Sequence, residues 1–101
     1  MSSRLNLQAE LEEILGNRNV YFQPPSSVRM QYPAIVYSRK DVDKRPADDI
    51  PYRKLPVYDL ILIDKNPDSV VIDKLLDLPY CSFVRHYESD NLNHDVFTIY
   101  Y

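Results

Sequence analysis

The sequence contains one glycine, one cysteine and no tryptophan among its 101 residues. Because Cys81 is the only cysteine, no intrachain disulfide can form, and a cysteine-based zinc site would need most of its ligands from elsewhere. One glycine is too few for a glycine-rich phosphate loop or a dinucleotide-binding fingerprint. We therefore expect no nucleotide cofactor and no bound metal ion.

Long apolar runs are also missing, since none approaches the ~18 residues that a membrane-spanning helix needs. Residues 1–18 interrupt their apolar pattern with three glutamates, unlike a secretory signal, and are predicted to form a helix. We expect no membrane partner, and a protein that is made and used in a cytoplasm.

A basic excess is lacking as well, because twelve Lys and Arg stand against fifteen Asp and Glu, for a net charge of −3. This balance does not favour direct, sequence-specific nucleic-acid binding. The chain instead has nine tyrosines and eight prolines, which are typical of half-exposed sheet surfaces, stiff loops and protein interfaces. The composition favours a scaffold over an enzyme.

Hydrophobic spacing predicts two helices. The first has four aliphatic residues on one stripe and can end at Gly16; the stripe consists of Leu7, Leu11, Ile14 and Leu15. The second is predicted to start at residues 66–69, where Asn66 can cap it, and to stop before Pro79.

Strands are predicted where β-branched and aromatic residues cluster, at residues 19–23, 34–39, 57–64, 81–87 and 95–101. Residues 88–94 are predicted to be a polar turn, and residues 41–56 a long charged loop or hairpin tip in solvent. Together the elements predict one α+β domain over residues 1–101, with two helices packed on one face of a four- or five-stranded, mostly antiparallel sheet. The other face is expected to carry Tyr37 and Tyr58 or their alternates, and the resulting exposed apolar surface predicts self-association.

Five potential metal ligands lie close together near the end of the chain: Cys81, His86, Asp90, His94 and Asp95. Their spacing matches no zinc site, and Cys81 and His86 face opposite ways if their strand is regular. The same argument weakens a nucleophilic Cys81–His86 pair, although His94 could approach across the hairpin. We expect a buried cysteine beside ordinary turn residues.

A metal-dependent nuclease would use Asp59, Asp64, Lys65 and Asp68. Asp59 and Asp64 lie five residues apart on a predicted strand and face opposite ways, and Lys65 directly follows Asp64. This geometry is poor, so no catalytic residue is predicted.

Protein contacts are the more favoured use of the unusual residues. Tyr and Arg are enriched where proteins anchor to each other. The interface candidates are Tyr52, Arg53 and Lys54 in the charged loop and Tyr100 and Tyr101 at the end of the chain.

Four local strings resemble small proteins encoded among the head and tail genes of long-tailed bacteriophages: residues 19–25 (NVYFQPP), 32–37 (YPAIVY), 62–69 (LIDKNPDS) and 90–95 (DNLNHD). The predicted order of elements is similar to that of the tail-terminator, or tail-completion, proteins of these phages. The resemblance implies a structural virion-assembly protein that forms a ring, typically a hexamer. Such a ring caps the tail tube and offers a docking surface to the head connector.

The same resemblance implies the partners and the location of the protein. The partners are other copies of itself, the tail tube protein and the head connector protein. The location is the head-tail junction of the virion, after assembly in the host bacterial cytoplasm. The chain stops at Tyr101 within its last predicted strand, so we expect no C-terminal docking extension.

Three alternatives stay open at this point. A head-completion or connector protein would touch a different partner first. A small metal-dependent nuclease would need the aspartates named above to come together. A monomeric regulatory module would present its tyrosines to a host protein.

Overall fold

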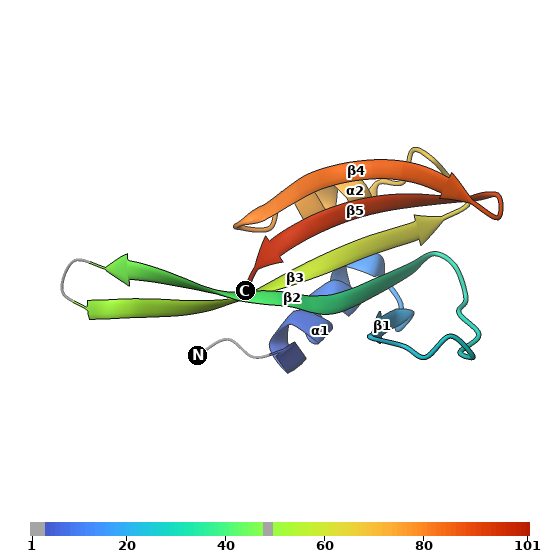
Figure 1. Cartoon of the computed structure of the whole chain (residues 1–101). Helices are drawn as coiled ribbons and strands as arrows, with labels where there is room; N and C mark the ends of the chain where they lie inside the picture. Colours follow the sequence, from blue (N-terminus) through green and yellow to red (C-terminus); the bar gives the residue numbers. More distant parts are fainter. Residues whose placement is uncertain (1–3, 48–49) are drawn as a thin grey trace.

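The computed structural model describes residues 4–47 and 50–101, and within these ranges it describes the side chains outside residues 41–55. Two helices and five strands follow each other along the chain (Figure 1). Their bounds are α1 Arg4–Leu15, β1 Val20–Phe22, β2 Ala34–Ala47, β3 Ile50–Asp64, α2 Val71–Leu76, β4 Cys81–Ser89 and β5 Leu92–Tyr100. Neither helix in these ranges has the length and apolar character needed to cross a membrane.

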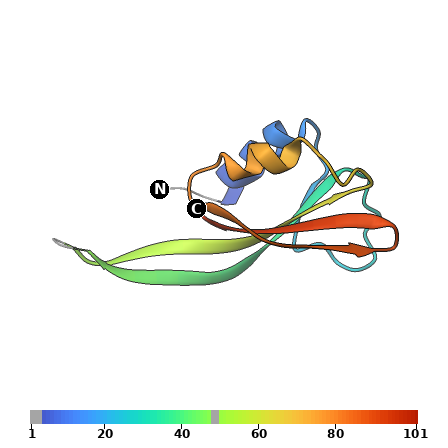
Figure 2. The same ribbon diagram turned by 90° about the horizontal axis from the view of Figure 1, so that it is seen from above.

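The five strands form one sheet in the order β1-β2-β3-β5-β4. β1 runs parallel to β2, and the three other neighbouring pairs are antiparallel. Both helices lie against one face of the sheet (Figure 2). The predicted α+β fold, with helices on one face of a mostly antiparallel sheet, is confirmed.

The apolar stripe of α1 is buried as its spacing predicts. Leu7, Leu11 and Leu15 face the core, whereas Leu5, which lies off the stripe, is 67% exposed. Gly16 ends the helix with a φ of +85°, and its N–H donates to the Glu12 carbonyl at 2.9 Å. Glycine adopts this left-handed conformation without the steric penalty of a Cβ.

The core lies between the helices and the sheet. Register places Tyr37, Leu60 and Phe97 side by side on β2, β3 and β5, and all three are fully buried. The Tyr37 hydroxyl donates to Gln8 Oε1 on α1 at 2.5 Å, which satisfies a polar atom inside the core. Tyr58 is buried as well, so the uncovered face carries the alternates of the two tyrosines rather than the tyrosines themselves.

Those alternates form a modest apolar stripe across the uncovered face. Val36, Ile61 and Val96 lie opposite one another on β2, β3 and β5 and are half-buried. The uncovered face is therefore mixed in character rather than strongly apolar.

Residues 41–47 and 50–56, from the segment predicted as a charged loop or hairpin tip, form the outer half of the β2–β3 hairpin and are called the arm from here on. The two strands stay paired out to Ala47 and Ile50. β1 pairs with β2 no further than Tyr37, and β5 pairs with β3 only from Val57 inward. At the base of the arm the Tyr101 N–H donates to the Pro56 carbonyl at 3.0 Å, and beyond this bond the described arm strands pair only with each other. The arm projects beyond the body (Figures 1 and 2), and the molecule measures 49 × 26 × 22 Å.

Of the two predicted alternatives, the structure has the hairpin and not the loop. Antiparallel pairing is possible in so charged a segment because it uses backbone groups that nearly every residue has. Charged residues and prolines are also the residues that proteins place on open strand edges, where they limit unwanted pairing. By composition alone, such a ribbon cannot be distinguished from a loop.

The second helix begins later than predicted, at Val71 rather than at residues 66–69. Asn66 Oδ1 accepts the N–H of Asp68 at 3.0 Å and closes a local turn before the helix. Ser69 Oγ accepts the N–H of Val71 at 3.2 Å. Asn and Ser side chains both form such short bonds to the backbone, so the sequence pattern alone could not show at which of the two residues the helix starts.

The turn between β4 and β5 is tighter than the predicted seven-residue segment. Asp90 and Asn91 have φ values of +54° and +63°, the conformation that a two-residue hairpin turn requires. Asn93, which was predicted to be in the turn, is a buried strand residue and donates to the carbonyls of Asp64 and Lys65 at 3.2 and 3.1 Å.

Candidate protein-interaction site

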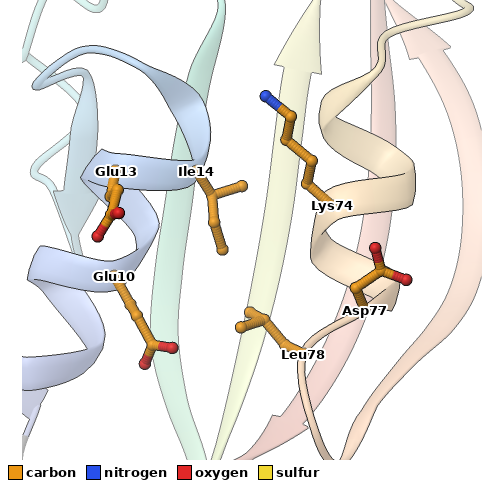
Figure 3. Close-up of a pocket in the computed structure, with 6 residues that line it drawn as sticks. All are labelled: Glu10, Glu13, Ile14, Lys74, Asp77 and Leu78. Atoms are coloured by element: carbon orange, nitrogen blue, oxygen red, sulfur yellow. The ribbon is translucent and has the colours of Figure 1, made fainter.

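A cleft of about 410 Å³ lies between α1 and α2 and is called the helix cleft (Figure 3). Ile14 and Leu78 pack against the core and supply its apolar lining. The polar lining consists of Glu10, Glu13, Lys74 and Asp77. Three carboxylates against one ammonium group make the helix cleft negative at neutral pH.

A second hollow of about 290 Å³ adjoins the helix cleft and shares Glu10 and Leu78 with it. Its other lining residues are Pro79, Tyr80, Ile99, Tyr100 and Tyr101, and it is called the tyrosine hollow. Tyr80 is the most exposed of the large apolar residues in the described chain, at 78%, and has a φ of +61°. A left-handed conformation is uncommon for an aromatic residue and disfavoured by sterics.

Glu10 joins the two hollows through a hydrogen bond. The Tyr101 hydroxyl donates to Glu10 Oε2 at 2.5 Å. This bond, together with burial and the negative charge of Glu10, raises the pKa of Tyr101 to about 12. The bond ties the end of the chain to α1.

The interface candidates named from sequence fall on two separate parts of the molecule. Tyr100 and Tyr101 line the tyrosine hollow. Tyr52, Arg53 and Lys54 lie in the β3 strand of the arm, and their side chains are outside the described part. Sequence reasoning missed Tyr80 and the carboxylates of the helix cleft. The glutamates on the polar side of α1 were visible, but nothing in the pattern indicated that α2 would lie beside them.

The register of the arm brings like charges together. Lys44 lies opposite Lys54, and Arg45 lies opposite Arg53. Like charges directly opposite each other on antiparallel strands are destabilising. The arm alone is therefore electrostatically unfavourable at these positions.

Charge is divided unevenly between the arm and the rest of the chain. Residues 44–54, the outer part of the arm, contain four Lys or Arg and two Asp, for a net charge of +2. The remaining residues of the chain, whose total is −3, carry −5. Asp41 and Asp43 lie nearer the body, so the positive charge is concentrated further out.

The exposed edge of the sheet is β4. Phe83 and Val84 on this strand are 46% and 54% exposed, and β5 is its only strand neighbour in the described chain. An edge strand with exposed apolar side chains is a surface at which another chain can add a strand.

The predicted opposition of Cys81 and His86 is wrong. A register shift between Phe83 and Arg85 inserts one extra residue into β4, so Cys81 opposite Ile99 and His86 opposite Asp95 lie on the same face. The two residues still lie about 13 Å apart along the sheet. Burial raises the pKa of the Cys81 thiol to about 11, which makes it a poor nucleophile.

The other sequence candidates for chemistry are dispersed. His86 Nδ1 pairs with Asp95 Oδ1 at 2.8 Å, whereas His94 Nδ1 lies 3.1 Å from the Leu92 carbonyl oxygen. Asp59 lies on the uncovered face of β3, where the Lys40 ammonium group approaches to 4.0 Å, and Asp64 lies on the other face. In the described ranges, no three His, Cys, Asp or Glu residues are placed to hold a metal ion.

Searches against protein-family models, curated proteins and solved structures found no match to this chain.

Proposed function

We propose that the chain is a self-associating structural subunit of a phage head-tail junction, and that it forms the ring that terminates the tail tube. The resemblance of its local strings to small proteins of phage head and tail genes, and of its order of elements to tail-terminator proteins, suggests this role. The fold is the expected one, and it carries surfaces suited to contacts with other subunits.

The observation that carries the proposal is the arm. A two-stranded ribbon without further packing is at best marginally stable in water, and the arm extends past the last pairing of both β1 and β5. A projecting ribbon of this kind gains stability when it packs on another molecule. In an assembly of identical subunits, that molecule is the next copy.

The exposed β4 edge supports the same role. A ring subunit needs two different, complementary surfaces, because a head-to-tail contact closes a circle only when its rotation divides the circle evenly. The arm extends β2 and β3 along the strand direction beyond the rest of the sheet, whereas β4 is an edge strand of the sheet. One surface can therefore contact the preceding subunit and the other the following one.

Light scattering and electron microscopy of the full chain, alone and with tail tube protein, test the proposal. We expect rings of a fixed number of subunits. A variant in which residues 44–54 are replaced by an Asn-Gly turn joins the paired residues Asp43 and Leu55, both of which have a backbone N–H to close the turn, and should remain folded. It should not form rings.

The variant is checked by circular dichroism and by cooperative unfolding, which should match those of the full chain. A full chain that stays monomeric at high concentration, with and without tube protein, would contradict the proposal. Deletion of the gene in its phage separates the two assembly roles. Overlong tails indicate a terminator, whereas normal tails beside DNA-leaking heads indicate a head-completion protein.

A further inference from the structure

We infer that the outer arm of one copy docks into the helix cleft of the next copy, so that Lys44 and Lys54, which lie opposite each other in its register, meet the carboxylates of the cleft. The inference rests on the proposed self-association and names the contact that produces it. The occupant of the cleft is a second copy of this chain.

The arm provides the cationic surface of the proposed contact. Two cross-strand pairs of like charge lie next to each other in its register, Lys44 with Lys54 and Arg45 with Arg53. Their repulsion is relieved when an anionic surface approaches the ribbon. The uneven charge distribution, +2 on residues 44–54 and −5 on the remainder, makes the body of another copy such a surface.

The helix cleft provides the anionic surface of the proposed contact. Glu13 on α1 and Asp77, the residue that caps the C-terminal end of α2, are exposed and face the cleft from its two walls (Figure 3). Lys74, the cation on the same lining, makes no ion pair with these carboxylates within 4.0 Å in the described chain. The apolar lining from Ile14 and Leu78 adds a surface on which the aliphatic stems of Lys and Arg can pack.

The tyrosine hollow extends this surface. Tyr80 and Tyr100 line it beside Glu10, which belongs to both hollows. Aromatic rings attract Lys and Arg cations placed over their faces. A ribbon with cations on both strands can therefore place some at carboxylates and others at tyrosines.

Geometry requires that the contact be between molecules. The arm continues the sheet away from the helices and past the end where the C-terminus lies (Figure 2). It does not turn back toward its own cleft. An arm in the cleft of the neighbour is a head-to-tail contact, which is the kind that generates a ring.

Charge reversal on the two surfaces tests the inference in the full chain. The cleft variant is Glu13→Lys with Asp77→Lys, and the arm variant is Lys44→Glu with Lys54→Glu. The matched control is Asp68→Lys at another exposed position of the body, and it is compared with Glu13→Lys alone and Asp77→Lys alone, because each of these three substitutions changes the charge by the same amount. Subunit association is measured by light scattering at low and at high salt.

We expect each reversed surface to weaken association by at least about tenfold, and the combination of both variants to recover most of the loss. The wild-type contact should weaken as salt rises, and the control should associate like the wild type. Folding is verified by circular dichroism, and both cleft substitutions replace exposed side chains.

Three results overturn the inference. Rings that persist in both variants at unchanged affinity place the contact elsewhere, and the proposed function then still stands. Variants that are weakened singly but not rescued together show that the two surfaces do not meet. An arm variant that loses binding to double-stranded DNA but keeps its ring shows that the arm contacts nucleic acid. A wild type that never associates contradicts the proposed function itself.

Discussion

The hydroxyl of Tyr101 donates a 2.5 Å hydrogen bond to Glu10, and this contact ties the end of the chain to the first helix. The two residues are 91 positions apart and both line the tyrosine hollow. Because Glu10 also lines the helix cleft, the bond fixes the wall between the two hollows. The geometry of the candidate contact surface therefore depends on a tertiary contact that neither segment can form alone.

Replacing this hydroxyl should change how stability depends on alkaline pH. The Glu10 bond raises the pKa of Tyr101 from its usual value of 10 to about 12. Above pH 10 the unfolded chain loses this proton while the folded chain keeps it, so the free energy of unfolding falls between pH 10 and 12. In Tyr101→Phe this fall should be shallower, as measured by urea unfolding at several pH values.

Tyr37 still contributes to the fall in the variant, because burial raises its pKa as well. The control is Tyr80→Phe, which removes a hydroxyl from an exposed side chain and leaves the Tyr101–Glu10 bond in place, so the alkaline fall caused by that bond should persist. An identical slope in Tyr101→Phe and the wild type would show that the bond to Glu10 does not persist in solution.

The two faces of α1 should respond very differently to loss of a leucine side chain. Leu11 is fully buried in the core, whereas Leu5 is 67% exposed. We expect Leu11→Ala to lower the free energy of unfolding by about 2–5 kcal/mol, because it removes buried apolar atoms and leaves a cavity. Leu5→Ala should change it by about 0.5 kcal/mol or less. Similar losses for the two variants in chemical denaturation would show that the helix is rotated from its described position.

The first helix could be predicted from sequence because its signals are local. A stripe of leucines one turn apart and a terminal glycine need only a few neighbouring positions to be recognised. Gly16 at a φ of +85° is found where the pattern placed it. Central strands were also predictable, since their apolar runs reflect burial of the strand itself.

The arm was one of two alternatives that its composition left open, whereas the β4 bulge and the helix cleft could not be predicted, because each depends on how one segment lies against another. The bulge moves His86 onto the face of Cys81 only through the register of β4 against β5. The helix cleft exists because Glu13 and Asp77, 64 positions apart, come to lie on adjacent helices. Periodicity within one segment contains no information about such juxtapositions.

The turn between β4 and β5 offers a stabilising substitution. Asn91 has a φ of +63°, and glycine is the preferred second residue in two-residue turns of this kind. We expect Asn91→Gly to raise the free energy of unfolding by about 0.3 kcal/mol, since asparagine already tolerates this conformation better than most residues. Ser89→Gly, within the neighbouring strand, should lower it by about 0.5–1 kcal/mol. Destabilisation by Asn91→Gly in thermal unfolding would contradict the described turn.

Tyr80 is expected to lower the stability of the fold and to strengthen the association of subunits. Its φ of +61° is unfavourable for a residue with a Cβ, yet its side chain is 78% exposed and contributes little to the core. Tyr80→Gly and Tyr80→Ala both remove the ring, but only glycine relieves the strain. After the greater entropy of glycine in the unfolded chain is allowed for, Tyr80→Gly should be about 0.5–1 kcal/mol more stable than Tyr80→Ala. Because the ring lines the proposed contact surface, both variants should weaken association equally in light scattering. The strained backbone at Tyr80 would then serve subunit contact and not the stability of the fold. Unchanged association in both variants would remove Tyr80 from the contact surface.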